Sequence, residues 1–429
     1  MNTSLTIPPG TSDLYGDQLK RRDYILSVLR GVYEKFGFEP LQTPTFEHES
    51  VFDGHHGEGE RIQFRFSDLG KTPLVLRYDL TVPMARFLAM HPEMPRPFRR
   101  FQIASAFRDD IVGDGHHREF IQCDADTVGV AHPTSDAEVV TMAAQGLTEL
   151  GFSKFMIRIN HRGIIKGLSE YVCRSSHDLN RVPRAIDYVD KYTHLGVVGI
   201  MPELMKRGLS KSEAKKLATI LSFKGTVGQT FEYLDRLFPV NSAARTSVGE
   251  LRTIYSYIPE EVQKHVRVDL SLARGADYYT GFILEGIIPG VAVGAVLGGG
   301  RYDKLMQKFG GKEDPAVGMA FGIERLMTAS EKLTIPNHAA CNPVLVYPHD
   351  DEAAQEVFRI ANALRKHGEK VNFCAQSMAS LNAIEYATNK HHTVIVVCMV
   401  DGNHQVICSG HNSGRLESRF RRLLHSVCS

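Results

Sequence analysis

Long apolar runs, an excess of one charge sign and closely spaced cysteines are all missing from this sequence of 429 residues. Without a run of about 18 apolar residues there is no candidate for a membrane-spanning helix. Residues 1–22 lack an apolar segment of signal-peptide length, so we expect a cytoplasmic protein. The formal net charge of +1 gives no overall attraction to nucleic acid, so any such binding has to come from a local patch.

Cysteine and histidine are present, but not at the spacings of a metal site. The seven cysteines are scattered without a Cys-x-x-Cys pair, which favours reduced thiols over a disulfide framework. Adjacent histidines occur at 55/56, 116/117 and 391/392, and none has a cysteine or a further histidine at a ligand spacing. We therefore expect no metal site built from the protein's cysteines or histidines.

The composition is that of a globular protein, with 43% hydrophobic and 23% charged residues, and the length predicts two or three domains. Residues 1–160 combine antiparallel strand patterns with helices on one face, which indicates an α+β layering. Strand patterns return over residues 264–334. From 338 to 429 strands alternate with helices, so we expect a small α/β domain with a largely parallel sheet.

Residues 161–263, between the two strand-rich parts, have the pattern of a helical insertion. Apolar periodicity predicts several helices here, including 184–192 and 226–238. Ser210 and Glu213 have the spacing of a capping box, which marks the start of another helix.

Further local patterns place elements on either side of this insertion. Periodic apolar residues predict a helix over 18–36, and the extended segment 38–46 contains Pro44, which suits an edge or interface strand. This pair fits a dimer surface and, equally, an ordinary helix–strand unit. Farther along we expect a strand over 291–297, then a helix after Gly-Gly-Gly-Arg-Tyr-Asp, residues 298–303.

The segment 100–129 holds a hairpin with an unusual charge arrangement. Strand-like runs over 101–107 and 120–130 flank a turn-rich loop, with Arg108 ending the first strand and Arg118 opening the second. Facing arginines repel unless an anion lies between them, and a polyphosphate is the obvious candidate. The alternative is a solvated hairpin with surface salt bridges to acidic neighbours such as Asp109.

Arg108 stands at the boundary between a strand and a glycine-containing loop. Two further arginines stand next to glycines at boundaries of predicted elements. They are Arg274 in LARGADYYTG and Arg325 in GIER. Glycine lets the backbone approach a ligand closely. Each arginine alone fits a buried salt bridge, but their joint occurrence with the glycine run 298–300 favours a polyanion site.

The complete set of motifs resembles the histidine–tRNA ligases, which are class II aminoacyl-tRNA synthetases, along nearly the whole chain. The eukaryotic-type branch of that family is the more similar one. The resemblance implies an antiparallel class II catalytic sheet with flanking helices, a helical insertion, a C-terminal α/β domain of the anticodon-binding type and a homodimer. The matching segments are PPGTSDLYG (8–16), the Pro44 segment as motif 1, LRYDLTVPMARFLAMH (76–91), residues 106–129 as motif 2, LARGADYYTG (272–281), GGGRYDKL (298–305) and VGMAFGIERL (317–326) as motif 3.

The resemblance also implies the reaction, in which histidine is activated with ATP and transferred to the 3′ end of tRNA(His). Arg108 corresponds to the arginine on the α-phosphate, with Asp110 near the adenine amino group and Arg118 also binding ATP. Arg325 matches the arginine on the γ-phosphate, and Arg274 one that assists at the α-phosphate. Arg108 and Arg274 are therefore the candidate catalytic residues. ATP, accompanied by Mg2+, is a substrate, and no tightly bound cofactor is implied.

Recognition of histidine needs partners for both ring nitrogens, because a neutral imidazole offers one donor and one acceptor. The resemblance places Asp126 and Tyr279 at the imidazole and Gln122 near the carboxylate. It places two further residues at the α-amino group. The full set of expected L-histidine contacts is Asp79, Thr81, Gln122, Asp126, Tyr278, Tyr279 and Tyr302.

The chain departs from the family pattern in regions that face tRNA. The motif 2 loop has His116 and His117 where Arg-Tyr is usual, and Asp109 stands where a basic residue is common. Ser12 replaces an arginine, and the segment 394–405 lacks the usual Gly-x-x-Glu. These departures weaken the tRNA part of the resemblance more than the histidine and ATP part.

A paralogue that kept the fold but changed the reaction is the alternative. One form is a histidine-sensing regulatory subunit of ATP phosphoribosyltransferase, which typically lacks the C-terminal domain and the counterpart of Arg274. Both are present here. The other form is an enzyme that activates an amino acid for a non-tRNA acceptor.

Overall fold

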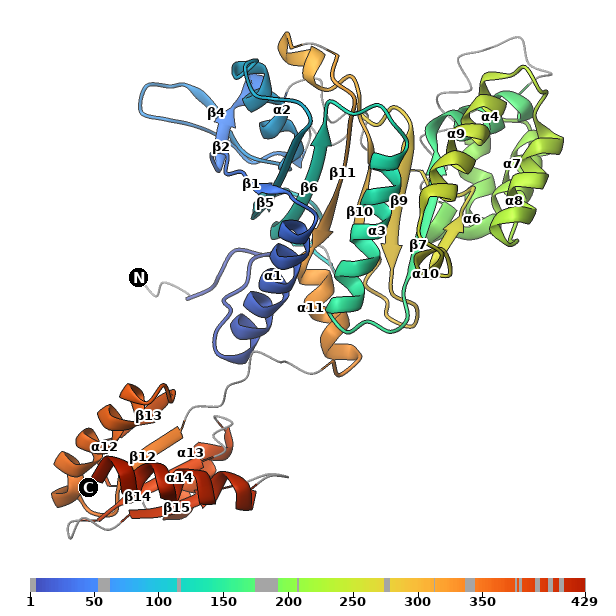
Figure 1. The fold of residues 1–429 in the computed structure, drawn as a ribbon. Coiled ribbons are helices and arrows are strands. Elements are labelled where there is room, and N and C mark those ends of the chain that lie inside the picture. Colours follow the sequence, from blue (N-terminus) through green and yellow to red (C-terminus); the bar gives the residue numbers. More distant parts are fainter. Residues whose placement is uncertain are drawn as a thin grey trace. The chain divides into compact units, whose positions relative to one another are not determined.

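The protein is described from a computed structural model, drawn in Figure 1. It divides into two compact units, residues 1–336 and 337–429. The structure describes residues 5–52, 62–113, 117–173, 192–206, 208–273, 278–311, 313–335, 344–374, 376–377, 380–389, 394–399, 404–408 and 413–428.

An eight-stranded sheet forms the centre of the first unit. Its strands have the order β1-β5-β6-β11-β10-β9-β7-β8. All neighbours are antiparallel except the parallel edge pairs β1–β5 and β7–β8. The bounds are β1 (Glu39–Pro40), β5 (Phe98–Phe107), β6 (Glu119–Val128), β7 (Met156–His161), β8 (Val266–Val268), β9 (Phe282–Ile287), β10 (Ala295–Arg301) and β11 (Ala316–Gly322).

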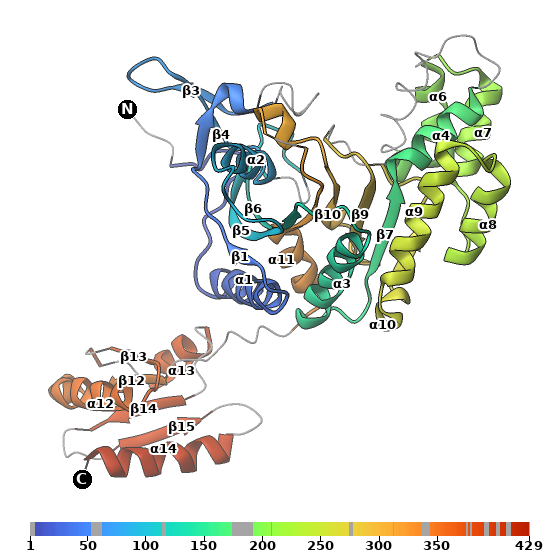
Figure 2. The ribbon, with the colours of Figure 1, turned by 45° about the horizontal axis from the view of Figure 1, so that its top comes forward.

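Three helices cover one face of this sheet (Figures 1 and 2): α1 (Asp17–Lys35), α3 (Thr134–Glu149) and α11 (Ile323–Lys332). Gly146 allows α3 to pack this closely, because a Cβ there would lie 2.9 Å from Phe321 Cζ and 3.1 Å from Leu29 Cδ2. The helices on one face of an antiparallel sheet confirm the expected α+β class.

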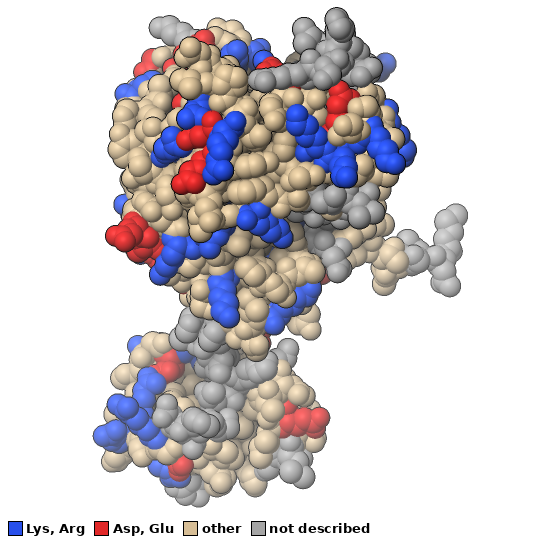
Figure 3. All heavy atoms as spheres, turned by 90° about the vertical axis from the view of Figure 1, so that its right-hand side faces the viewer, with Lys and Arg blue, Asp and Glu red and all other residues tan. Residues whose placement is uncertain are grey.

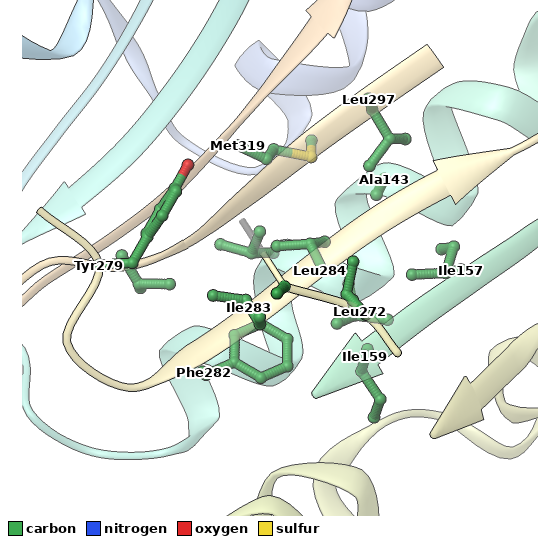
Figure 4. Packing of buried hydrophobic residues seen from close by; sticks show 14 of the residues in the cluster. Ala143, Ile157, Ile159, Leu272, Tyr279, Phe282, Ile283, Leu284, Leu297 and Met319 are labelled. Carbon is green, nitrogen blue, oxygen red and sulfur yellow. The ribbon is translucent and has the colours of Figure 1, made fainter. Parts of the chain in front are cut away.

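Strand alternation directs apolar side chains towards these helices and polar ones towards the opposite face. In β6, Cys123 and Ala125 alternate with Asp124 and Asp126. Figure 4 shows part of the apolar packing, with Ala143 of α3 near side chains of β7, β9 and β10. The opposite face of the central strands therefore carries the polar groups.

A small second sheet and one helix stand beside β5. The sheet has the order β2-β4-β3 with bounds β2 (Phe46–His48), β4 (Pro73–Leu76) and β3 (Arg65–Ser67). The short 3-10 helix η1 (Glu49–Val51) follows β2, and helix α2 (Thr81–Met90) follows β4. Arg77, which follows β4, donates to Ser105 O at 2.6 Å and so ties this part to β5.

A module of helices follows β7: α4 (Arg162–Val172), α6 (Tyr192–Lys206), α7 (Lys211–Leu221), α8 (Val227–Leu237), α9 (Ala243–Tyr257) and α10 (Glu260–Gln263). The capping box of Ser210 and Glu213 starts α7 as predicted, and Thr226 with Gln229 forms a second one at α8. The helix expected over 184–192 falls outside the described residues, apart from the first residue of α6.

The second unit has a four-stranded sheet of order β13-β12-β14-β15. Its first three strands are parallel and β15 is antiparallel, which agrees with the expected α/β pattern. The bounds are β12 (Val344–Pro348), η4 (Asp351–Ala353), α12 (Ala354–Lys366), β13 (Val371–Phe373), α13 (Ser380–Asn389), β14 (Val394–Cys398), β15 (His404–Cys408) and α14 (Ser413–Cys428).

The structure differs from two expectations for the region of the glycine run, in the bounds of a strand and in the type and length of a helix. The strand expected over 291–297 begins at Ala295 and includes all three glycines. Glycine has a low strand propensity, but a Cβ on Gly299 would lie 2.1 Å from Gly318 O, so close pairing with β11 requires it. Instead of a helix after Asp303, the structure has a short 3-10 turn, η3 (Met306–Phe309). None of the described helices is long and apolar enough to cross a membrane.

Candidate active site

A hollow of about 240 Å³ opens beside strands β6, β9, β10 and β11. Three of the expected ATP-binding residues, Arg108, Asp110 and Arg325, line it together with Gln122. They come from the hairpin β5–β6 and from the start of α11, which are far apart in sequence. The other lining residues are His117, Phe120, Glu285, Ala295, Val296, Leu297, Gly298, Ala320, Phe321, Gly322 and Glu324.

Arg108 is held by aromatic rings. Its guanidinium carbon lies 4.2 Å from the centre of the Tyr78 ring and 4.9 Å from that of Phe120. Its Nε is buried and has no hydrogen-bond partner within the described part of the chain. The side chain is therefore fixed in place with donor capacity left for an anion.

Arg118, by contrast, is engaged by the loop itself. Its Nη2 lies 3.0 Å from Asp109 Oδ1, and its Nε donates to the Asp110 carbonyl at 3.3 Å. Its own carbonyl accepts from Arg108 N at 2.9 Å. Arg118 is not among the residues that line the hollow. The surface salt bridge that the sequence left open as an alternative is thus present for Arg118.

The start of α11 closes the hollow through Glu324 and Arg325. Arg325 Nη1 donates to the Ala295 carbonyl at 2.7 Å, which fixes it to β10. Both carboxylate oxygens of Glu324 accept from Ile121 N, at 3.0 and 3.1 Å. Strand β11 ends at Gly322, so the Glu324 side chain supplies the next acceptor that β6 needs on this side. Burial raises the pKa of Glu324 to about 7.

A second cluster surrounds Asp126 farther along β6. Tyr302 Oη donates to Asp126 Oδ1, and Arg100 Nη2 of β5 lies 2.7 Å from Asp126 Oδ2 in an ion pair. Tyr278 lies at ring-centre distances of 4.8 Å from Tyr279 and 5.8 Å from Tyr302. Figure 4 shows the Tyr279 hydroxyl directed away from the nearby apolar side chains of strand β9.

The turn before α2 brings the expected α-amino contacts beside this cluster. Asp79 Oδ1 accepts from Val82 N at 3.0 Å and thereby caps the helix, while Thr81 is its first residue. Arg100 Nη2 donates to the Leu80 carbonyl at 3.2 Å. One arginine therefore joins the turn 79–81 to Asp126.

The residues of β11 that pair with the polar residues of β6 are small. On β11, Gly318, Ala320 and Gly322 pair with Asp126, Asp124 and Gln122 of β6. A Cβ on Gly318 would lie 1.9 Å from Asp126 Oδ1. Glycine is therefore required at 318 if Asp126 is to keep its position.

Buried polar atoms without a hydrogen-bond partner occur at this site. Among the described residues they include Arg108 Nε, Gln122 Oε1 and Arg100 Nη1. Buried polar atoms are normally satisfied, so a concentration of unsatisfied ones indicates a place where a polar ligand binds.

Sequence reasoning missed Arg100, Asp124 and Glu324. The alternation in Gln-Cys-Asp-Ala-Asp indicates that Asp124 and Asp126 share a face, but only strand pairing reveals that Arg100 lies opposite Asp126. The expected catalytic residue Arg274 lies outside the described residues. Within the described residues no group of three His, Cys, Asp or Glu side chains could hold a metal ion.

The family model for histidyl-tRNA synthetase matches residues 10–326. The chain belongs to the histidyl-tRNA synthetase family. The histidine–tRNA ligase of Aeropyrum pernix is 39% identical to it over 332 residues, which cover 76% of this chain and 74% of that relative. The histidine–tRNA ligase of Gloeobacter violaceus is 35% identical over 390 residues, which cover 84% of this chain and 83% of that relative.

Solved structures of histidyl-tRNA synthetases have the same fold. The crystal structure of the enzyme from Nostoc sp. has a TM-score of 0.79 at 24% identity, covering 98% of this chain and 100% of that one. A structure described as an ATP phosphoribosyltransferase regulatory subunit/histidyl-tRNA synthetase from Bacillus halodurans has a TM-score of 0.74 at 23% identity. The predicted class II synthetase fold is therefore confirmed.

Proposed function

We propose that this chain is an aminoacyl-tRNA ligase that activates histidine with ATP and transfers the histidyl group to the 3′ end of tRNA. In the first step the histidine carboxylate attacks the α-phosphate of ATP, which gives histidyl-adenylate and pyrophosphate. The observation that carries this proposal is one hollow lined by Arg108, Arg325 and Gln122, with the buried carboxylate of Asp126 farther along the same strand as Gln122. The relatives named histidine–tRNA ligase support the same reaction.

The hollow suits the nucleotide. Arg108 is held rigidly between Tyr78 and Phe120, so its charge is already oriented when a phosphate arrives. We assign it to the α-phosphate, where charge changes during the attack, and Arg325 to the γ-phosphate. Arg274 is proposed to assist Arg108, and Asp110 to read the adenine amino group. ATP would enter with Mg2+ as part of the substrate.

The cluster around Asp126 suits the amino acid. Among the described residues, the buried carboxylates of Asp79, Asp124 and Asp126 share the site, and Arg100 forms ion pairs with the last two. The ammonium group of an amino acid would add positive charge where it is lacking, and we assign it to Asp79 and Thr81. Asp126 Oδ2 has acceptor capacity left for an imidazole N–H.

The remaining members of the predicted set have supporting roles in this proposal. We assign Gln122 to the substrate carboxylate, because its side chain lines the hollow on the same strand as Asp126. Tyr279 is proposed to meet the second imidazole nitrogen, with Tyr278 and Tyr302 enclosing the ring. Arg118 binds ATP in this proposal only if its ion pair with Asp109 and its hydrogen bond to the Asp110 carbonyl break.

Transfer to tRNA is proposed to use the second unit as an anticodon-binding domain and the helices of 161–263 as an insertion in the catalytic domain. Figure 3 shows the face of the first unit that carries these helices, where lysine and arginine occur in separate patches divided by uncharged surface and acidic side chains. Each phosphate contact adds to the salt dependence of binding. Because the sequence of residues 343–429 has no marked basic patch, we expect a shallow salt dependence and a larger share of stacking and base-edge contacts. We also propose a homodimer and a cytoplasmic location.

The test is ATP–pyrophosphate exchange with each of the twenty amino acids, followed by charging of tRNA from the same source. We expect exchange with histidine alone and transfer to tRNA(His). Adenylate formation without charging of any tRNA would refute the ligase assignment and leave a non-tRNA acceptor. Histidine binding without exchange would instead indicate a sensor.

Asp126→Asn tests the imidazole assignment in the same assay. An amide presents a donor as readily as an acceptor, so a mispaired buried group should weaken histidine binding by about 1–3 kcal/mol. ATP binding should change far less. Equal losses for both ligands in calorimetry would show that Asp126 is structural.

A further inference from the structure

Among the described residues Arg100 is the largest fully buried side chain, with 1% of its surface exposed. It lies on β5 opposite Asp126 of β6, and its side chain points to the face of the sheet that carries the site. Its Nη2 lies 2.7 Å from Asp126 Oδ2 and 3.9 Å from Asp124 Oδ2. Its Nε donates to Met84 Sδ at 3.2 Å.

The same guanidinium reaches the other half of the proposed histidine pocket. Nη2 also donates to the Leu80 carbonyl, at 3.2 Å, between Asp79 and Thr81. Arg100 thus fixes the distance between the carboxylate assigned to the imidazole and the turn assigned to the α-amino group. A side chain that only stabilised the core would not need to join these two elements.

Arg100 also affects the protonation of the two aspartates next to it. Burial raises the pKa values of both Asp124 and Asp126, and Arg100 opposes that rise. Arg100 Nη2 lies closer to Asp126 Oδ2 than to Asp124 Oδ2, so its charge favours the ionised form of Asp126 more strongly than that of Asp124.

We propose that Arg100 is a positioning residue for amino-acid specificity, because it keeps Asp126 an ionised acceptor at a fixed distance from the turn 79–81. This inference rests on the proposed function. A carboxylate can only accept a hydrogen bond and therefore demands a ring N–H from the substrate, whereas a protonated carboxyl can also donate. Loss of Arg100 thus relaxes the demand for an imidazole.

The experiment compares Arg100→Gln with Arg99→Gln in the full-length protein. Arg99 is the next residue of β5 and points to the opposite face, where its Nη2 lies 2.9 Å from Glu138 Oε1 of α3. Both substitutions remove a guanidinium and an ion pair from the same strand, but only one faces the proposed pocket. The readouts are KM for histidine and for ATP in pyrophosphate exchange, and the preference for histidine over β-(2-thienyl)alanine, whose ring has no N–H.

For Arg100→Gln we expect KM for histidine to rise about 10-fold or more, since a buried acceptor is mispaired, while KM for ATP stays within about 3-fold. The preference for histidine over the thienyl analogue should fall by about the same factor. Arg99→Gln should leave both quantities near those of the wild type. A purely structural role would lower the use of both amino acids equally.

A pH series gives an independent readout. Within the described residues, the titratable and charged groups that interact electrostatically with Asp126 are Arg100, Asp124, Asp79, Tyr302 and Tyr33. Removing the one cation among them raises the pKa of Asp126, so in Arg100→Gln the acceptor forms only at higher pH. The ratio of KM for histidine, variant over wild type, should therefore fall as pH rises from 6.5 to 9, and titration of free histidine cancels in this ratio.

The outcomes separate clearly. If Arg100→Gln matches Arg99→Gln in KM, preference and pH profile while the wild type uses histidine, Arg100 is only a structural ion pair and the inference is wrong. If the wild type does not use histidine, the proposed function fails and the inference fails with it.

Should Arg100→Gln not fold, Arg100→Lys replaces it. Lysine keeps the positive charge but lacks the planar guanidinium with its several donors. KM for histidine should therefore rise about 5-fold, while the preference for histidine over the thienyl analogue is retained; an unchanged KM would overturn the inference.

Discussion

Replacing Gly318 by alanine tests whether the space beside Asp126 is as tight as the structure indicates. The added Cβ would lie 1.9 Å from Asp126 Oδ1, 2.5 Å from its Cγ and 2.8 Å from the Ala125 carbonyl oxygen. The carbonyl belongs to the paired strand β6 and cannot move alone, and Asp126 is held by Arg100 and Tyr302. The side chain of Asp126 has to leave its position.

The cost has two parts. Overpacking in a close-packed interior costs about 1–3 kcal/mol. Displacing Asp126 also leaves Arg100 as a buried charge with a weakened partner, and breaking a buried ion pair costs about 3–5 kcal/mol. Since Asp124 Oδ2 lies 3.9 Å from Arg100 and compensates in part, we expect a total loss at the lower end of this sum, about 4 kcal/mol. At about 2–4 °C per kcal/mol, the melting temperature should fall by roughly 8–16 °C.

The assay pairs thermal melting with pyrophosphate exchange. Gly318→Ala should raise KM for histidine about 10-fold or more, since its acceptor is displaced, and change KM for ATP much less. Gly249→Ala is the matched control, because nothing lies within 4 Å of a Cβ there and alanine suits the interior of helix α9. That control should gain about 0.5–1 kcal/mol. A Gly318→Ala protein with unchanged melting and unchanged KM would refute the placement of Asp126.

Three further predictions concern the pH dependence of stability, pyrophosphate exchange and tRNA charging. Glu324→Gln removes a carboxyl whose pKa is about 7 in the folded protein and ordinarily 4.5. Because folding favours the protonated form, the stability of the wild type falls as pH rises from 4.5 to about 7. Relative to the wild type, the variant should therefore gain about 3 kcal/mol of unfolding free energy between pH 4 and pH 8, and urea melts showing a constant difference would contradict the buried titration. Arg274→Ala should slow histidine-dependent pyrophosphate exchange about 10²-fold or more, a typical loss for one electrostatic donor, and unchanged exchange would remove this residue from the mechanism. Deleting residues 338–429 should abolish tRNA charging but leave adenylate formation within about 10-fold, because the two units are compact on their own; loss of both activities would show that the units depend on each other.

The sequence alone determined those features that depend on near neighbours in the chain. The strand-like runs over 101–107 and 120–130 gave the hairpin, and the spacing of Ser210 and Glu213 located a helix start. The order of strand and helix patterns gave the α+β class, and the motifs gave the family. These signals survive in a linear sequence because side-chain periodicity and capping act over only a few residues.

Only the tertiary structure decided which charged groups meet. The hairpin pattern in the sequence placed both Arg108 and Arg118 at a polyphosphate, but packing against Tyr78 and Phe120 holds Arg108 at the hollow, while Arg118 bonds to its own loop. The partnership of Arg100 with Asp126 and the bond from Glu324 to Ile121 likewise follow from strand register and helix placement.

The glycine run 298–300 fails as a local signal for the same reason. Its weak strand propensity indicates a loop, yet strands β9 and β11 pair with it on both sides and leave no space for side chains at Gly299 and Gly300. Register, close approach and ion pairs between distant segments are properties of the assembled sheet, and no local pattern specifies them.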